Sequence, residues 1–183
     1  STEGQWAFGE PQGAGWDPAS GFTGPNVYGY NLAGVYGDNL PAYALTTPPL
    51  NCSGSENVSL SFRRWLGVED AFWDHATIEA SNDGANWVVV WDHIDTDLQD
   101  TSWQAVSYDI SAIADDSPTV QIRWLMGPTD EAIGYSGWNL DDIQLSGNYV
   151  DIMTVGPVQG LLSSGYQGGS FSPTQQVYTL TNI

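Results

Sequence analysis

The chain has 183 residues, 41% of them hydrophobic and 14% charged, so it is long and apolar enough to bury a core. Its 22 acidic residues face only three basic ones, which gives a formal net charge of −19. This balance argues against nucleic acid and anionic membranes as partners, because both require a basic surface, and it favours bound cations. An acidic surface suited to a salty or calcium-rich habitat would give the same composition.

The first fifty residues are expected to form short strands between long loops. Glycine and proline are frequent between residues 9 and 25, and Pro41 and Pro48 suit strand edges and turns better than a central strand. The single cysteine, Cys52, leaves no partner for a disulfide within the chain. No apolar run reaches membrane-spanning length, so we expect no membrane insertion.

Short runs of alternating apolar and polar residues then predict strands for most of the remaining chain. Residues 58–62 and 76–80 alternate cleanly, and Asp83-Gly84 supplies a tight turn, so a β-hairpin is expected over residues 77–91. Further strands are expected at 103–108, 120–126 and 138–145, with one helical turn at 109–114. Because no long segment has a 3.6-residue period, the pattern predicts an all-β fold, an antiparallel β-sandwich.

A domain boundary is expected near Ser146-Gly147-Asn148. It would separate a module over residues 1–147 from a linker and the truncated start of a following domain over residues 148–183. Strand-like patterns at 150–155 and 177–181 flank a stretch rich in glycine and serine. The alternative is that this segment adds edge strands to the first module.

Three segments carry a resemblance to a known family. They are Trp65-Leu66-Gly67-Val68-Glu69 with Trp73-Asp74-His75-Ala76, then Ile78-Glu79-Ala80-Ser81-Asn82-Asp83-Gly84 with Trp87, and finally Gly137-Trp138-Asn139-Leu140-Asp141-Asp142-Ile143. Together they resemble the MAM-like (concanavalin-like) jelly-roll modules of secreted bacterial proteins. Such modules accompany peptidases of the immune-inhibitor-A type and polysaccharide-active enzymes. The resemblance covers about residues 45–145.

The resemblance implies a two-sheet jelly roll without catalytic machinery, and a structural cation, usually Ca²⁺, near the closing acidic pair. Residues 169–173 and 178–182 separately resemble the opening of an Ig-like repeat of bacterial surface proteins. The glycine-rich N-terminal region and the paired Arg63 and Arg64 have no counterpart in this pattern, so the family's binding partner does not transfer.

Acidic residues provide the candidate metal ligands, since calcium takes about six to eight oxygen ligands. Glu69, Asp70 and Asp74 cluster in one loop. Asp141 and Asp142 follow each other on the closing strand, and Asp38 could join from the N-terminal region. Because a strand alternates its faces, only one of the closing pair is expected to point at a given site. The alternative is an ion pair in which Arg63 or Arg64 neutralises Asp141 or Asp142 without metal.

Nine tryptophans and nine tyrosines point to a possible glycan platform, because flat aromatic rings stack on sugar faces. The family resemblance instead implies a place in the core for four tryptophans at strand positions, Trp65, Trp87, Trp103 and Trp138, where large aromatic residues add buried area. Among the other aromatic residues, the predicted platform is formed by Trp16, Tyr28, Tyr30 and Trp73.

No catalytic motif appears: there is no GxSxG, HExxH or phosphate-binding loop, and His75 and His93 are expected to be ordinary surface histidines. We therefore expect a non-catalytic, calcium-stabilised accessory module of a larger secreted protein. Its expected partners are a polysaccharide or glycan and the other domains of the same polypeptide. The alternatives are a spacer or adhesion module without a sugar ligand, and a polysaccharide-degrading enzyme.

Overall fold

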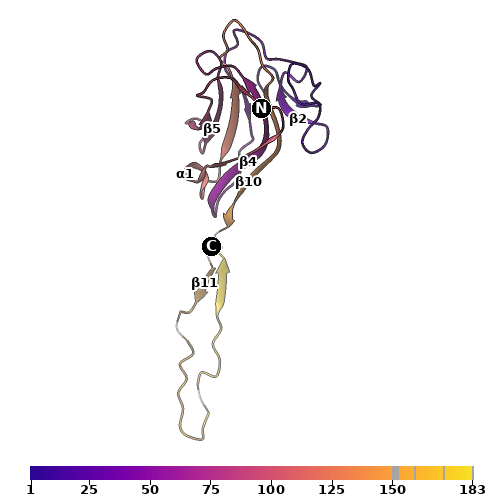
Figure 1. Cartoon of the computed structure of the whole chain (residues 1–183). Coiled ribbons are helices and arrows are strands. Elements are labelled where there is room, and N and C mark those ends of the chain that lie inside the picture. The colour runs from indigo at the N-terminus through magenta and orange to yellow at the C-terminus, as the bar shows by residue number, and fades with distance from the viewer. Residues whose placement is uncertain (150–152, 159, 171, 183) are drawn as a thin grey trace. The chain divides into compact units, whose positions relative to one another are not determined.

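The computed structural model describes residues 1–149, 153–158, 160–170 and 172–182. They divide into two compact units, Ser1–Asn148 and Tyr149–Ile183, coloured from indigo to orange and from orange to yellow in Figure 1. The described residues include one helix, α1 (Ser111–Ala114), and none that is long and apolar enough to cross a membrane.

Two antiparallel sheets make up the first unit. The larger sheet, here sheet 1, has the order β1-β2-β10-β4-β7, and β8 also pairs with β4. Its strands are β1 (Trp6–Gly9), β2 (Val27–Tyr30), β4 (Ser55–Val68), β7 (Leu98–Gln99), β8 (Gln104–Asp109) and β10 (Gly137–Tyr149). Sheet 2 has the order β3-β9-β5-β6, with strands β3 (Tyr43–Thr46), β5 (Ala76–Ser81), β6 (Val88–Asp92) and β9 (Gln121–Met126).

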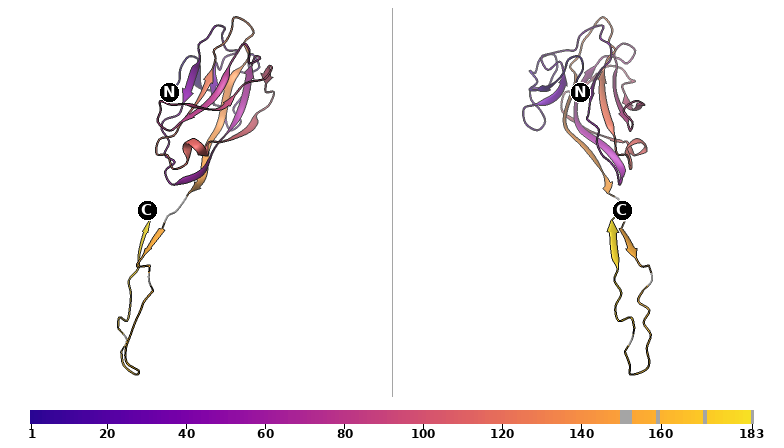
Figure 2. Two further views of the ribbon diagram at one scale, coloured as in Figure 1. Left: turned by 90° about the vertical axis from the view of Figure 1, so that its left-hand side faces the viewer. Right: turned by 180° about the vertical axis from the view of Figure 1, so that it is seen from behind.

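The chain crosses repeatedly between the two layers. After β2 it enters sheet 2 with β3, returns with β4, and crosses again for β5–β6, β7–β8, β9 and β10. Figures 1 and 2 show β4 and β10 in one layer and β5 in the other. This connectivity confirms the expected all-β fold, an antiparallel β-sandwich of the jelly-roll type.

The core lies between the two sheets, as the alternation of buried and half-buried residues along β4 shows. From Val58 to Phe62 the even-numbered residues are buried and apolar, as is Leu66, whereas the odd-numbered residues between Ser59 and Trp65 are only half-buried. From sheet 2, Trp124 packs edge-on against Phe62 with ring centroids 5.6 Å apart. Large apolar side chains buried from both sheets supply most of the stability of such a sandwich.

The predicted hairpin is confirmed, with β5 paired antiparallel to β6. Asp83 closes its turn: the carboxylate accepts the amide hydrogens of Ala85 and Asn86 at 2.8 and 2.7 Å, and Gly84 has a φ of +72°. Because these hydrogen bonds stabilise the charged form, they lower the pKa of Asp83. The predicted helical turn is α1.

Most of the tryptophans predicted for the core lie elsewhere. Trp138 is fully buried as expected, but Trp65, Trp87 and Trp103 are only half-buried. Trp65 is out of phase with the buried residues of β4, and Trp87 lies under Arg123, whose Cζ is 4.1 Å from the ring centroid. The core instead includes Trp124.

In the second unit, β11 (Met153–Gly156) pairs antiparallel with β12 (Thr179–Asn182). An isolated bridge joins Ser164 to Ser172. Residues 150–152 of the predicted strand at 150–155 lie outside the described residues. The resemblance of this segment to an Ig-like repeat stays a prediction.

Candidate metal and ligand sites

Three carboxylates lie close together at one end of the sandwich. Glu69 directly follows β4, Asp74 lies just before β5, and Asp130 follows β9. Carboxylate oxygens of the three residues lie within 4.8 Å of one another. Glu69 and Asp74 are 9% and 1% exposed, and Asp130 is half-buried. We call these three residues the acidic triad.

Tyr36 and a backbone amide hold the triad in place. The Tyr36 hydroxyl donates to Asp74 Oδ2 at 2.5 Å and accepts the Glu69 N–H at 3.2 Å, while the Asp130 N–H donates to Asp74 Oδ1 at 2.9 Å. Burial and the neighbouring Asp74 carboxylate raise the pKa of Tyr36, so its hydroxyl keeps the proton that it donates. These bonds fix the orientation of the Asp74 carboxylate and hold the backbones of Glu69 and Asp130 beside it.

No basic side chain neutralises the triad among the residues that the structure describes, where the two ion pairs are Arg64–Asp100 and Arg123–Glu79. Burial raises the pKa of both Glu69 and Asp74, and the carboxylates of Asp74 and Asp130 raise that of Glu69 further. In addition, Glu69 Oε2 is buried without a hydrogen-bond partner. Three carboxylates, one with an unsatisfied buried oxygen, are hard oxygen donors of the kind that calcium takes, so these residues fit part of a calcium coordination shell.

The triad contains two of the six predicted metal ligands and one residue that was missed. Asp38 is exposed, and Asp70 accepts the Phe72 N–H at 2.9 Å; neither belongs to the triad. Asp130 could have been noticed as the first acidic residue after the strand predicted at residues 120–126. Its approach to Asp74 follows from the pairing of β5 with β9, in which Ala76 is opposite Met126.

The closing acidic pair forms a separate cluster. Thr23 donates its backbone N–H to Asp141 Oδ2 at 2.8 Å and its hydroxyl to Asp142 Oδ2 at 2.9 Å. The expectation that only one of the pair can point at a given site is wrong, because Asp142 has a φ of +48° that interrupts the alternation of the strand. The ion-pair alternative is also wrong, since neither arginine pairs with them: Arg64 binds Asp100 and Arg63 lies over the Phe22 ring.

The four residues of the predicted glycan platform have different surroundings. Trp16, Trp73 and Tyr28 are 66%, 49% and 39% exposed, but Tyr30 is fully buried and has no face to offer a ligand. The Trp73 ring contacts Phe72 at 4.5 Å between centroids, and the Tyr28 ring contacts Phe8 at 4.8 Å.

A different aromatic surface lies on the outer face of sheet 1. The Trp65 indole N–H donates to the carbonyl oxygen of Trp16 at 2.9 Å, and the Trp65 and Trp103 rings meet edge-on at 5.9 Å between centroids. Arg63, two residues before Trp65 on the same face of β4, lies over Phe22 at 4.1 Å. We call Trp16, Trp65 and Trp103 the tryptophan face.

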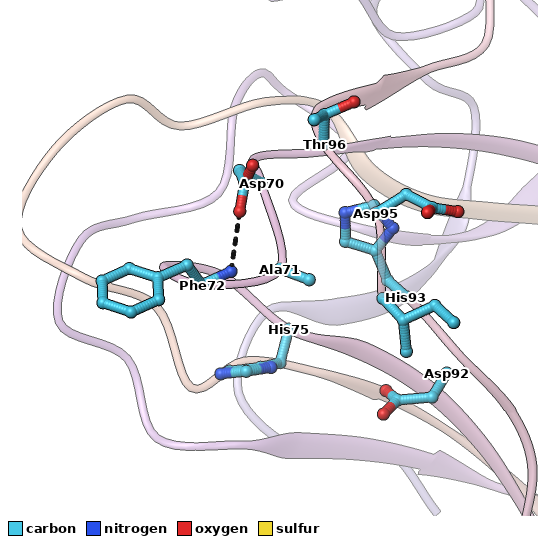
Figure 3. Close-up of a pocket in the computed structure, with 9 residues that line it drawn as sticks. Asp70, Ala71, Phe72, His75, Asp92, His93, Asp95 and Thr96 are labelled. Atoms are coloured by element: carbon cyan, nitrogen blue, oxygen red, sulfur yellow. Dashed lines mark hydrogen bonds between the residues drawn. The ribbon is translucent and has the colours of Figure 1, made fainter.

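A groove of about 610 Å³ runs beside the acidic triad, between residues 70–75 and residues 92–96 (Figure 3). The Phe72 side chain projects away from the two histidines, and His75 and Asp92 both line the groove. His93 is buried and hydrogen-bonds the Glu69 carbonyl oxygen at 3.0 Å, so the expectation of a surface histidine is wrong for this residue. Neither histidine belongs to a metal-ligand cluster within the described part of the chain.

No protein-family model matches the sequence, but individual known proteins are similar to it. Bacillopeptidase F of Bacillus subtilis (strain 168) is 30% identical over 146 residues, a match that covers 79% of this chain and 9% of that protein. A solved structure described as "CBM4 structure and function" is 16% identical with a TM-score of 0.39, covering 79% of this chain and 95% of that chain.

Proposed function

We propose that residues Ser1–Asn148 form a non-catalytic, calcium-stabilised accessory module of a larger secreted protein, and that the module binds a neutral glycan. The observation that carries the proposal is the tryptophan face. The Trp65 and Trp103 rings lie outside the core and meet edge-on, and Trp16, whose carbonyl oxygen accepts the Trp65 indole N–H, is 66% exposed. Rings held in this way offer apolar faces to sugar rings, while neighbouring polar groups bind the hydroxyls.

The charge of the chain indicates which class of glycan fits. With a net charge of −19, the protein repels uronic acids and sulfated sugars at long range. Near the tryptophan face, Arg63 can donate hydrogen bonds to hydroxyls. Neutral polysaccharides such as glucans, xylans and mannans therefore suit this surface best.

Calcium would be held by the acidic triad. Carboxylate oxygens of Glu69, Asp74 and Asp130 would supply part of the roughly six to eight ligands that Ca²⁺ takes, with water supplying others. The ion would offset the repulsion between the carboxylates and give Glu69 Oε2 a partner. It would stabilise the end of the sandwich at which β4 and β9 end and β5 begins.

The match to bacillopeptidase F supports an accessory role. The match covers only 9% of a protein that is a peptidase by name, as expected for a module attached to a separate catalytic part. It also supports a second candidate, a spacer beside a peptidase that binds no sugar. In either case we propose that the segment after Asn148 begins a neighbouring domain.

Replacing Trp65 by alanine should weaken glycan binding at least about tenfold, because central aromatic residues carry most of the affinity of such surfaces. The measurement is affinity electrophoresis of the chain in calcium buffer, in gels that contain soluble neutral glucans, xylans or mannans. Trp87→Ala is the matched control, since Trp87 is equally half-buried but belongs to the hairpin of sheet 2. Its affinity should not change.

Two results would contradict the glycan proposal. If no neutral polysaccharide retards the wild-type chain while calcium still raises its melting temperature, the spacer candidate replaces it. If Trp87→Ala and Trp65→Ala weaken retardation equally, the tryptophan face is not the binding surface.

A further inference from the structure

A buried carboxyl group joins the N-terminal loop to the closing strand. Asp17 lies in the loop between β1 and β2 and is 7% exposed; Asn139 lies in β10 and is fully buried. The Asn139 side-chain Nδ2–H donates to Asp17 Oδ1 at 2.8 Å. Opposite Asn139 is Gly29, where a Cβ atom would lie 2.7 Å from Asn139 Oδ1, so glycine makes room for the amide.

The remaining oxygens of this pair have no donor. Asp17 Oδ2 and Asn139 Oδ1 are both buried and without a hydrogen-bond partner. Two neighbouring buried acceptors without hydrogen-bond partners lower the stability of the fold, unless a proton or a cation lies between them. A carboxylate and an amide oxygen also repel each other in a medium of low dielectric constant.

No charged or titratable neighbour supplies that donor. On β10, Asp141 accepts a hydrogen bond from Thr23, and on β4, Arg63 lies over Phe22. On β2, the two tyrosines contact other rings: Tyr28 meets Phe8 and Tyr30 meets Trp6. Neither ion pair of the described residues involves Asp17.

We propose that Asp17 is protonated in the folded protein, and that its Oδ2–H donates to Asn139 Oδ1 to close a cyclic acid–amide pair. One proton then satisfies both unpartnered oxygens, and the bond from Asn139 Nδ2 is the second bond of the ring. Burial raises the pKa of Asp17 to about 7, whereas the hydrogen bond from Asn139 acts in the opposite direction. A bound cation is the competing occupant.

The pair makes the attachment of the N-terminal loop dependent on pH. The pKa of Asp17 is about 7 in the folded protein, against 3.8 for an unperturbed aspartate. Between these values the folded chain binds one proton more than the unfolded chain, so stability falls as pH rises and levels off above about pH 7. Trp16 is next to Asp17 in the chain, so the loop that carries Trp16 is held most firmly in mild acid. Any effect of pH on glycan affinity rests on the proposed function, whereas the proton shared by Asp17 and Asn139 is independent of it.

Carbon-13 NMR of aspartate-labelled protein tests the proton directly. We expect one carboxyl carbon to titrate near pH 7 in the wild type and to be missing in Asp17→Asn. If the signal that Asp17→Asn removes titrates near the usual value for aspartate, about 3.9, the proposal is overturned.

Melting temperatures test the consequence. In Asp17→Asn the new amide supplies the missing donor at every pH, so we expect a melting temperature equal to that of the wild type at about pH 5 and about 5 °C higher at about pH 8, in constant calcium. Asp38→Asn removes the same charge from an exposed position and should shift the melting temperature equally at both pH values. Parallel pH profiles for Asp17→Asn and the wild type would contradict the acid–amide pair. Destabilisation at both pH values with the loss of one bound ion would show a cation in its place.

Discussion

Replacing Asp100 by alanine should lower the free energy of unfolding by about 3–5 kcal/mol, because it leaves the half-buried Arg64 guanidinium without its ion-pair partner. Asp100 is 9% exposed and accepts hydrogen bonds from Arg64 Nε and Nη2 at 3.0 and 3.2 Å and from the Leu66 N–H at 3.0 Å. All three donors would lose their acceptor, and the guanidinium would keep its charge in a half-buried position.

Urea denaturation of the chain in calcium buffer measures this loss. Asp95→Ala is the matched control, since it removes the same charge from an exposed position and should change stability by less than about 0.5 kcal/mol. Asp100→Asn should lie between the two, because its amide oxygen can still accept from Leu66. A loss below about 1 kcal/mol in Asp100→Ala would contradict the account of this pair.

The Asp100 contact also bears on the tryptophan face. Arg64 and Leu66, which Asp100 binds, flank Trp65 on β4. Asp100 therefore holds the side chain that precedes Trp65 and the backbone N–H of the residue that follows it. We expect Asp100→Asn to weaken glycan retardation less than Trp65→Ala does, because the ring itself remains.

Calcium should reverse the order of stability of the wild type and Glu69→Gln. In a chelator, the wild type holds three crowded carboxylates, so the neutral variant should melt at the higher temperature. With calcium at about 100 times its dissociation constant, the wild type should gain about 2.7 kcal/mol, or roughly 5–10 °C in melting temperature. The variant has lost a ligand and should gain much less.

Differential scanning calorimetry with and without chelator measures the melting temperatures of the wild type and Glu69→Gln under both conditions. Asp70→Asn is the control, since Asp70 lies next to Glu69 in the chain but outside the triad, and it should respond to calcium as the wild type does. Magnesium should stabilise less, because it requires a stricter geometry and gives up its water reluctantly. Equal responses of Glu69→Gln and the wild type would place the ion elsewhere.

The fold could be predicted from the sequence because its signals are local. Alternation at residues 58–62 and 76–80 and the Asp83-Gly84 turn depend on neighbours along the chain, and the structure has β4, β5 and the hairpin there. The same alternation would have placed Trp65 correctly, because Trp65 is out of phase with Phe62 and Leu66.

The sites were harder to predict because they depend on contacts between distant segments. Asp130 reaches Asp74 only through the pairing of β5 with β9, and Tyr30 is buried through its edge-on contact with Trp6 at 5.6 Å. Asp142 points beside Asp141 because of one positive φ angle, which the sequence pattern does not reveal. The periodicity of apolar residues in the sequence reveals neither which strands pair in which register nor where a backbone angle departs from the regular strand.

Isothermal titration of the metal-free chain with calcium chloride tests the central claim most directly. We expect saturable binding of one ion per chain that Glu69→Gln abolishes and Asp70→Asn preserves. Binding that survives in Glu69→Gln, or no heat and no rise in melting temperature in the wild type, would show that the acidic triad does not hold a cation.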